Sequence, residues 1–182
     1  MNRIQVTTVM ILAMLTGCEN KEAQPGYKGE ITFSSEKILS GESYLVYGYS
    51  FEKGTFLPYP APGEDKPDIL VINETDNMNN ITGAVLSSPD NSNAFHLDGT
   101  FGTQQQATAF FDAYTQVTDS VFSGLSEKVD PNQVWTFQTT AGQFAKLLVE
   151  EVTVKTDSKV QDYVEVRVAF HFQPDGTRNF DN

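Results

Sequence analysis

The sequence predicts an α+β, β-rich fold: a mostly antiparallel sheet with C-terminal hairpins and a helical excursion in the middle. Three observations support this class. Segments rich in β-branched and aromatic residues recur along the chain, one central segment has helical periodicity, and the C-terminal third alternates apolar and polar residues. The chain has 182 residues and no tandem repeat, so a single domain can hold the whole core.

Short strands and loops alternate in the first half of the chain. The prolines of 57–66 exclude a central strand there, and 73–80 and 87–93 have the asparagine, serine and proline content of loops. The expected strands are compact runs of apolar, aromatic and β-branched residues. They lie at residues 30–33, 44–51, 68–72 and 83–86.

One helix is expected in the middle of the chain. Thr103 and Gln106 resemble a capping box, in which the threonine accepts a bond from a free backbone amide. A second helical segment over 117–125, restarted at Thr118 or Asp119, extends the same apolar face. The first face has the i, i+3, i+4, i+7 spacing and consists of Ala107, Phe110, Phe111 and Tyr114.

The C-terminal third predicts two hairpins. Strands at 134–138 and 144–149 are joined by a turn in which Gly142 supplies a positive φ. The apolar phase then slips at Glu150 and Glu151, which predicts a β-bulge. A second turn is expected near residues 157–158.

The last strand alternates along its length. One expected face is apolar, and the other is polar. Lys146, on the strand at 144–149, and Arg167, on the last strand, are expected to be solvated or to pair with Glu151 or Glu165 on neighbouring strands. The apolar face consists of Val164, Val166, Val168, Phe170 and Phe172, and the other of Glu165, Arg167, Ala169 and His171.

The N-terminus has the pattern of a secretory signal over residues 1–17. Arg3 precedes an apolar stretch over 4–15 that is too short to span a membrane. The sequence 15–18, Leu-Thr-Gly-Cys, resembles the lipobox of bacterial lipoproteins. That resemblance implies cleavage before Cys18 and acylation of this residue, with chains such as palmitate holding the protein on a membrane. The alternative is a buried thiol in an N-terminal helix.

Residues 18–28 are polar, with a Pro-Gly break, and are expected to form a lipidated tether before a single β-rich domain at 29–182. The acidic and lysine residues after Cys18 resemble the export signal of surface lipoproteins in Bacteroidetes. The expected location is therefore the outer membrane or the cell surface, outside the cytoplasm. A periplasm-facing anchor is the alternative.

The chain is acidic, with a formal net charge of −12 at pH 7. This charge argues against nucleic acid as a partner and against electrostatic docking on anionic lipid. Cys18 is the only cysteine, so neither an intramolecular disulfide nor a cysteine-based zinc site is expected. No Gly-x-Ser-x-Gly motif is present, and we expect no enzyme activity.

Two stretches resemble the HmuY-like haem-binding surface lipoproteins of Bacteroidetes. Residues 133–147 match that family's aromatic hairpin with a glycine turn, and 50–54 followed by 68–71 match its opening strands. The resemblance implies a β-rich fold and haem capture outside the cell. Haem iron takes imidazole or thioether ligands, and both histidines, His96 and His171, lie between apolar residues. They are the candidate haem ligands, or else two unrelated surface histidines.

The sequence therefore predicts a non-catalytic, lipid-anchored, extracytoplasmic binding protein, with haem as the first candidate ligand. The alternative is a structural or assembly lipoprotein that binds another protein through a sheet edge or a loop.

Overall fold

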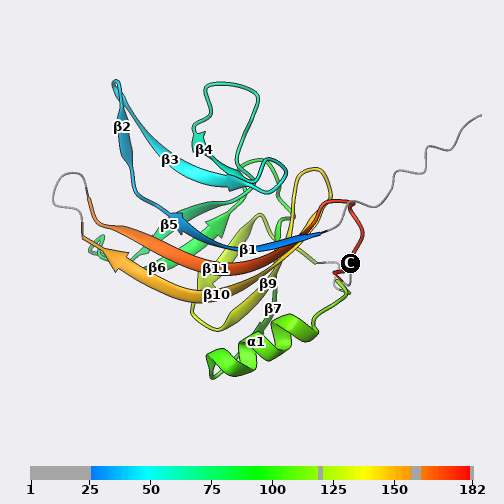
Figure 1. Cartoon of the computed structure of the whole chain (residues 1–182). Helices are drawn as coiled ribbons and strands as arrows, with labels where there is room; N and C mark the ends of the chain where they lie inside the picture. Colours follow the sequence, from blue (N-terminus) through cyan, green and yellow to red (C-terminus); the bar gives the residue numbers. More distant parts are fainter. Residues whose placement is uncertain (1–25, 119–120, 157–160, 181–182) are drawn as a thin grey trace, which may run out of the picture.

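The computed structural model describes residues 26–118, 121–156 and 161–180. It confirms the β-rich α+β class, with antiparallel sheets and a single short helix in the middle of the described chain (Figure 1). The elements are β1 (Tyr27–Ser34), β2 (Ile38–Ser40), β3 (Ser43–Ser50), β4 (Thr55–Tyr59), β5 (Leu70–Thr75), β6 (Ile81–Ser87), β7 (Phe95–Thr100), α1 (Gln104–Ala113), β8 (Leu125–Val129), β9 (Gln133–Gln138), β10 (Phe144–Lys155) and β11 (Tyr163–Gln173).

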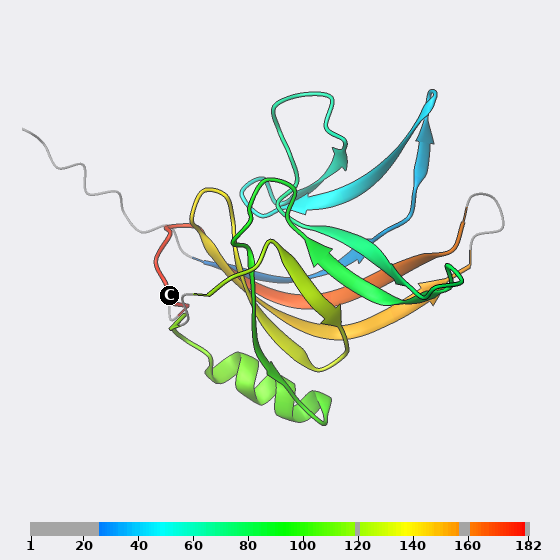
Figure 2. The ribbon, with the colours of Figure 1, turned by 180° about the vertical axis from the view of Figure 1, so that it is seen from behind.

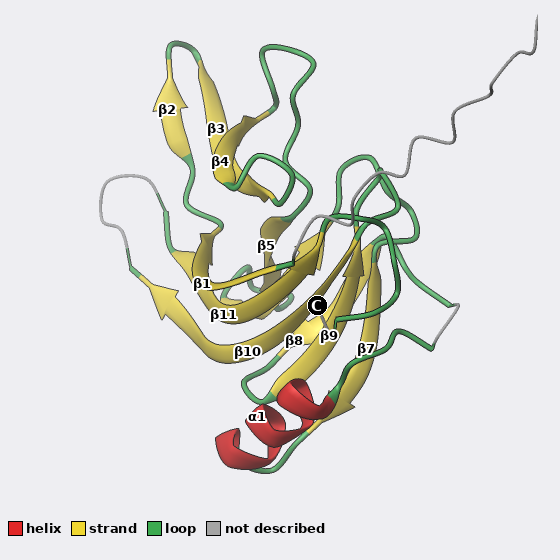
Figure 3. Cartoon of the chain, turned by 45° about the vertical axis from the view of Figure 1, so that its right-hand side comes forward, coloured by secondary structure: helices red, strands yellow, loops and turns green. Residues whose placement is uncertain are grey.

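The strands form one large sheet and two small ones. The large sheet has the order β1-β11-β10-β9-β7, and the small sheets have the orders β2-β3-β4 and β5-β6-β8. A bridge between Tyr49 and Ile69 joins the two small sheets at one point. We call the β2-β3-β4 sheet the arm, because it stands away from the large sheet on the side opposite α1 (Figure 3).

The core lies between the large sheet and the small sheets. The predicted apolar face of β11 is confirmed, since all five of its residues are buried there. Aromatic rings fill the centre: Phe51 stacks on Phe172 at 5.3 Å between centroids and lies 5.6 Å from Phe137. Each such ring contributes about 1.5–3 kcal/mol by leaving water.

Both predicted features of β10 are confirmed. Its register with β11 shifts between Val149 and Glu151, at the expected bulge, and Gly142 in the preceding turn has φ +81°. The expected cross-strand pair also forms, with Arg167 Nη2 lying 3.5 Å from Glu151 Oε2. The second turn, expected near 157–158, lies outside the described residues.

Helix α1 covers the outer face of the large sheet (Figure 2). Thr103 is the N-cap, as predicted, and its Oγ1 accepts from Gln106 N at 3.3 Å. Ala107 and Phe111 pack against Val134 and Leu148 on the outer face of β9 and β10. The five-stranded sheet is therefore covered on both faces at this end.

The predicted second helical segment is wrong. Val117 packs with Phe144 and Phe180, its N–H donates to Arg178 O at 2.9 Å, and Leu125 begins β8 instead. Helical spacing over 117–125 arose by coincidence, because Val117 and Leu125 belong to different parts of the fold. The strand β7 was not predicted, since its register shifts between Leu97 and Gly99 and interrupts the alternation.

Two expected boundaries also differ from the structure. Pro58 lies inside β4 rather than in a loop, which the sheet tolerates because β4 is an edge strand. Strand β1 begins at Tyr27, within the segment expected to be tether. Tyr27 packs edge-on against Phe170 and Phe172, so these contacts extend the folded domain backward.

Residues 1–25 lie outside the described residues, and with them Cys18, the expected signal and most of the expected tether. In the part of the chain that the structure describes, no helix has the length and apolarity needed to cross a membrane.

Candidate functional site

A cleft of about 760 Å³ lies where the arm, β5 and the open ends of β10 and β11 meet. This volume is within the range of small-ligand and peptide sites. Residues from five strands and three connecting segments line it, so it forms only when the whole domain is folded. None of these residues is among the ligand-binding residues that the sequence predicts.

Strand β5 forms the floor of the cleft. Four consecutive residues, Leu70 to Asn73, line it, as does Thr75. Side chains alternate between faces along a strand, so a surface that touches consecutive residues is in contact with the strand's edge. Within its sheet β5 pairs only with β6, so the edge that faces the cleft carries no neighbouring strand over 70–75.

Apolar side chains form the walls. Val46 of β3 and Tyr59 of β4 are register partners and therefore project from the same face of the arm. Ile81 of β6 and Val154 of β10 line the cleft from other strands. Val154 is 48% exposed and Ile72 on the floor is 44% exposed, which leaves apolar surface available to a ligand.

The Thr75 end of the floor is polar. Asn79 and Asn80 line it from the turn between β5 and β6, and Asp162 lines the cleft just before β11. The carboxylate of Asp76 closes that turn by accepting from the backbone N–H of Met78 at 2.8 Å and of Asn80 at 2.9 Å. The Asn80 side chain donates to it as well, and these bonds lower the pKa of Asp76. The asparagine-rich loop is thus a closed, ordered turn.

Ser35 anchors the floor to the large sheet. Its Oγ donates to Asn73 Oδ1 on β5 and accepts from Val164 N on β11 at 2.8 Å. Its backbone N–H donates to Val164 O at 3.0 Å. One serine therefore ties β1, β5 and β11 together at the base of the cleft.

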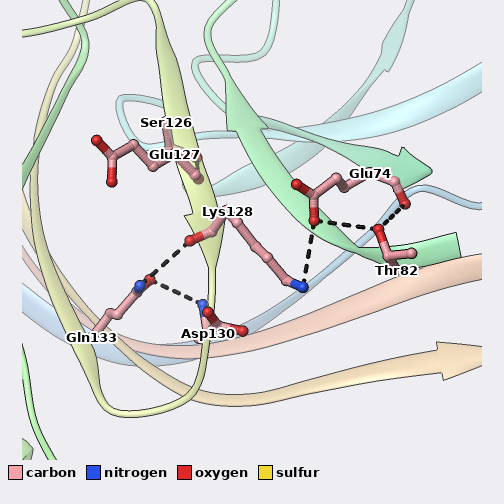
Figure 4. A network of polar contacts seen from close by, with 7 residues as sticks. All are labelled: Glu74, Thr82, Ser126, Glu127, Lys128, Asp130 and Gln133. Atoms are coloured by element: carbon pink, nitrogen blue, oxygen red, sulfur yellow. Dashed lines mark hydrogen bonds and ion pairs between the residues drawn. The ribbon is translucent and has the colours of Figure 1, made fainter. Parts of the chain in front are cut away.

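A second polar network holds β5 from its paired side (Figure 4). Lys128 of β8 lies 3.5 Å from Glu74 of β5, and Thr82 of β6 donates to Glu74 O at 3.4 Å. Gln133 links the end of β8 to β9 by donating to Lys128 O at 3.3 Å and accepting from Asp130 N at 2.9 Å. The free edge of β5 is therefore backed by an ordered sheet.

Neither predicted histidine lies in this cleft. His171 is on the outer face of β11, 1% exposed, with its ring 5.4 Å from that of Phe180. Neither ring nitrogen has a hydrogen-bond partner among the described residues. Burial, with the nearby charges of Lys28 and Lys146, lowers the pKa of His171 to about 4. Buried and neutral, this imidazole packs as an apolar side chain would.

His96 is half-buried on β7, and its Nδ1 lies 2.9 Å from Val121 O. The structure does place both histidines in one row across the outer face. His96 is paired with Thr136, Thr136 with Lys146, and Lys146 with His171. The two histidines are thus three strand spacings apart, about 14 Å.

These residues do not fit a haem between them. A haem held by both imidazoles would have to stand on the sheet between them, over Thr136 and Lys146. The row between them is filled. Tyr114 Oη lies 3.0 Å from Thr136 Oγ1, which in turn donates to Asp98 Oδ2 at 2.8 Å.

The expectation that Lys146 is a solvated or cross-strand charge is wrong. The side chain is 4% exposed, and its ammonium donates to the carbonyls of Phe111 at 2.5 Å and Tyr114 at 2.7 Å. These are among the free carbonyls at the end of α1, where a cation is also favoured by the helix dipole. The alternation of residues 144–149 predicts that Lys146 projects from the face opposite Leu147. The sequence pattern does not predict that α1 covers this position.

In the described ranges no three histidine, cysteine, aspartate or glutamate side chains come together as a metal site would require. Comparison of the sequence with protein-family models finds no match, and comparison with curated proteins finds none either. The candidate site therefore rests on its geometry: a preformed cleft with an open strand edge, apolar walls and one polar end.

Proposed function

We propose that this chain is a non-catalytic, lipid-anchored binding protein of the outer membrane or cell surface that takes its ligand in the cleft. The cleft carries the proposal, because it combines about 760 Å³ with exposed apolar walls and a floor braced on both sides. The anchor follows from the resemblance of residues 15–18 to a lipobox.

Binding in the cleft can be tested with Nile red, a neutral apolar dye. In the described ranges all residues of the three apolar clusters lie between Tyr27 and Phe180, so a 26–182 fragment contains these clusters. We expect saturable dye fluorescence that falls at least fivefold in Val46→Trp, which fills the cleft. Leu125→Trp is the matched control, because Leu125 is 49% exposed on β8 and does not line the cleft. Equal dye binding by Val46→Trp would refute the cleft as the site.

The anchor can be tested in cells with the full chain. We expect the protein to incorporate an alkyne-tagged palmitate and to fractionate with the membrane. Cys18→Ser should abolish the label and release the protein, since several acyl chains account for nearly all of the expected membrane affinity. Membrane retention of an unlabelled Cys18→Ser protein would contradict lipidation.

The alternative function, binding of another protein, is favoured by one observation. The floor of the cleft is an unpaired strand edge, and such edges accept added strands. Haem as ligand continues to rest on the sequence resemblance, since the two histidines lie outside the cleft.

A further inference from the structure

We propose that the cleft binds an extended peptide segment of another protein, which adds as a strand to the free edge of β5. This inference rests on the proposed function, because it names the ligand class of the same site. An added strand would take its main-chain hydrogen bonds from β5 and place alternate side chains against the walls. Six residues of β5 offer an edge of about 20 Å.

The part of the β5 edge that lines the cleft is without the usual guards of a sheet edge. Sheet edges are normally guarded by charge, proline or short length. Strand β5 has no proline, and its one charged residue, Glu74, pairs with Lys128; residues Leu70–Asn73 are uncharged, and Ile72 is 44% exposed. The other terminal strands are guarded by Lys28 and Glu30 in β1, Asp98 in β7, Pro58 in β4, Lys128 in β8 and a length of three residues in β2.

The edge is also held ready for a partner. Strand β3 lies beside the start of β5, where Tyr49 N donates to Ile69 O at 2.9 Å. The other end of β3, residues 43–45, pairs with β2. The bond from Ser35 to Asn73 and the ion pair of Glu74 with Lys128 hold β5 in place. A preordered edge lowers the entropy cost of adding a strand.

The charge and polarity of the cleft define the peptide. The Leu70 end of the floor is apolar and the Thr75 end is polar, so we infer a segment with alternating apolar side chains at the first end. Two charged side chains line the cleft, Lys37 and Asp162. Asp162 has no ion pair among the described residues, and the whole chain carries a net charge of −12. A lysine or arginine of the peptide that lies at Asp162, and not at Lys37, complements this carboxylate and the net charge.

The experiment is a selection of random nine-residue peptides, displayed on phage, on the immobilised 26–182 fragment. We expect enriched peptides to alternate apolar residues and to carry a basic residue at one end. Synthetic copies should bind at least tenfold more weakly to Ile72→Lys, which adds a charged guard to an exposed edge position. Leu125→Lys, the same change on the opposite edge of the same sheet, should alter affinity less than twofold.

Backbone chemistry distinguishes strand addition from apolar binding alone. Peptides N-methylated at alternate amides, in the phase that removes the edge-facing donors, should lose binding at least tenfold, and the opposite phase should lose less. Strand addition would be overturned if peptides methylated in the two phases bound equally well. It would also be overturned if the Ile72→Lys protein bound the peptides as tightly as the wild type. If no peptide is enriched while Nile red still binds in a Val46-dependent way, the proposed cleft function holds and the peptide inference falls. A dimer of the fragment that Ile72→Lys dissolves, without peptide binding, would assign the edge to a second copy and also overturn the proposal.

Discussion

The two sides of the large sheet use polar residues in opposite ways. On the side under α1, His171, Lys146 and Thr136 form a row that is almost entirely buried and closed by the helix and Phe180. On the other side, at the cleft, apolar and amide side chains remain open around an unpaired strand edge. Residue types that usually signal chemistry are thus part of the packing, whereas apolar and amide residues line the open cleft.

On the side of the large sheet under α1, which we call the closed side, the largest effect is expected from removal of the Lys146 ammonium. Lys146→Met keeps the length of the side chain but leaves the carbonyls of Phe111 and Tyr114 without their charged donor. We expect the free energy of unfolding to fall by about 2–4 kcal/mol, measured by urea denaturation. Lys155→Met is the control, because Lys155 lies on the same strand at 42% exposure and pairs with Glu165 at 3.3 Å. That change should cost less than about 1 kcal/mol. Equal losses would show that the buried lysine contributes no more than a surface one.

The closed side should also make stability depend on pH through His171. The pKa of its imidazole is about 4 in the folded protein, against 6.5 in the unfolded chain. Between these values the unfolded state binds more protons, so stability is full above pH 6.5 and falls as the pH decreases. From pH 7 to pH 5 we expect a loss of about 2 kcal/mol attributable to this residue.

Urea denaturation of the wild type and of His171→Asn at both pH values isolates this contribution, since carboxylates titrate alike in the two proteins. His96→Asn, the same change at the half-buried histidine, is the control. An unchanged pH slope in His171→Asn would contradict the burial of a neutral imidazole.

The contact of β3 with the start of β5 can be distorted at Gly48. A Cβ at this position would lie 2.6 Å from both Leu70 Cδ2 and Pro67 Cβ, and closer still to the carbonyl of Ile69. Gly48→Ala should therefore push β3 from β5, cost about 1–3 kcal/mol, and weaken Nile red binding. Gly63→Ala, with no atom within 4 Å of the added carbon, should leave both unchanged. Unchanged dye binding by a destabilised Gly48→Ala variant would show that binding in the cleft does not depend on this contact.

The smallest expected effect concerns haem. Titration of the 26–182 fragment should give no shift of the Soret band that depends on His96 or His171, because His171 is buried and the row between the two imidazoles is filled by Thr136 and Tyr114. The comparison is between wild type, His96→Ala and His171→Ala. A saturable Soret shift that is lost in either variant would contradict this expectation and make haem the first candidate ligand again.

Local patterns predicted the local parts of the fold well. The alternation of β11, the bulge near Glu151, the glycine turn at Gly142 and the Thr103 cap depend on neighbours in the chain, and all were confirmed. The burial of His171 was not visible, because the outer face of β11 changes along its length. Arg167 is 48% exposed on that face, whereas His171, four residues further along the strand, is covered by residues distant in sequence.

The cleft could not be predicted for the same reason. It joins Ser35, Tyr59, Ile72 and Asp162, which lie far apart in the sequence and carry no motif. One local signal was present: residues 69–72 form an apolar strand without a charge, which is typical of a central strand. The structure instead places this strand at an edge, and the conflict between composition and position marks the site.

The path of β1 gives the molecule a polarity. This strand begins at Tyr27, near the described end of the C-terminus, and runs for eight residues, about 26 Å, toward Ser35 and Lys37 at the cleft (Figure 1). The lipid proposed on Cys18 would attach on the Tyr27 side of this strand. The opening would then lie at the end of the domain far from the point of attachment.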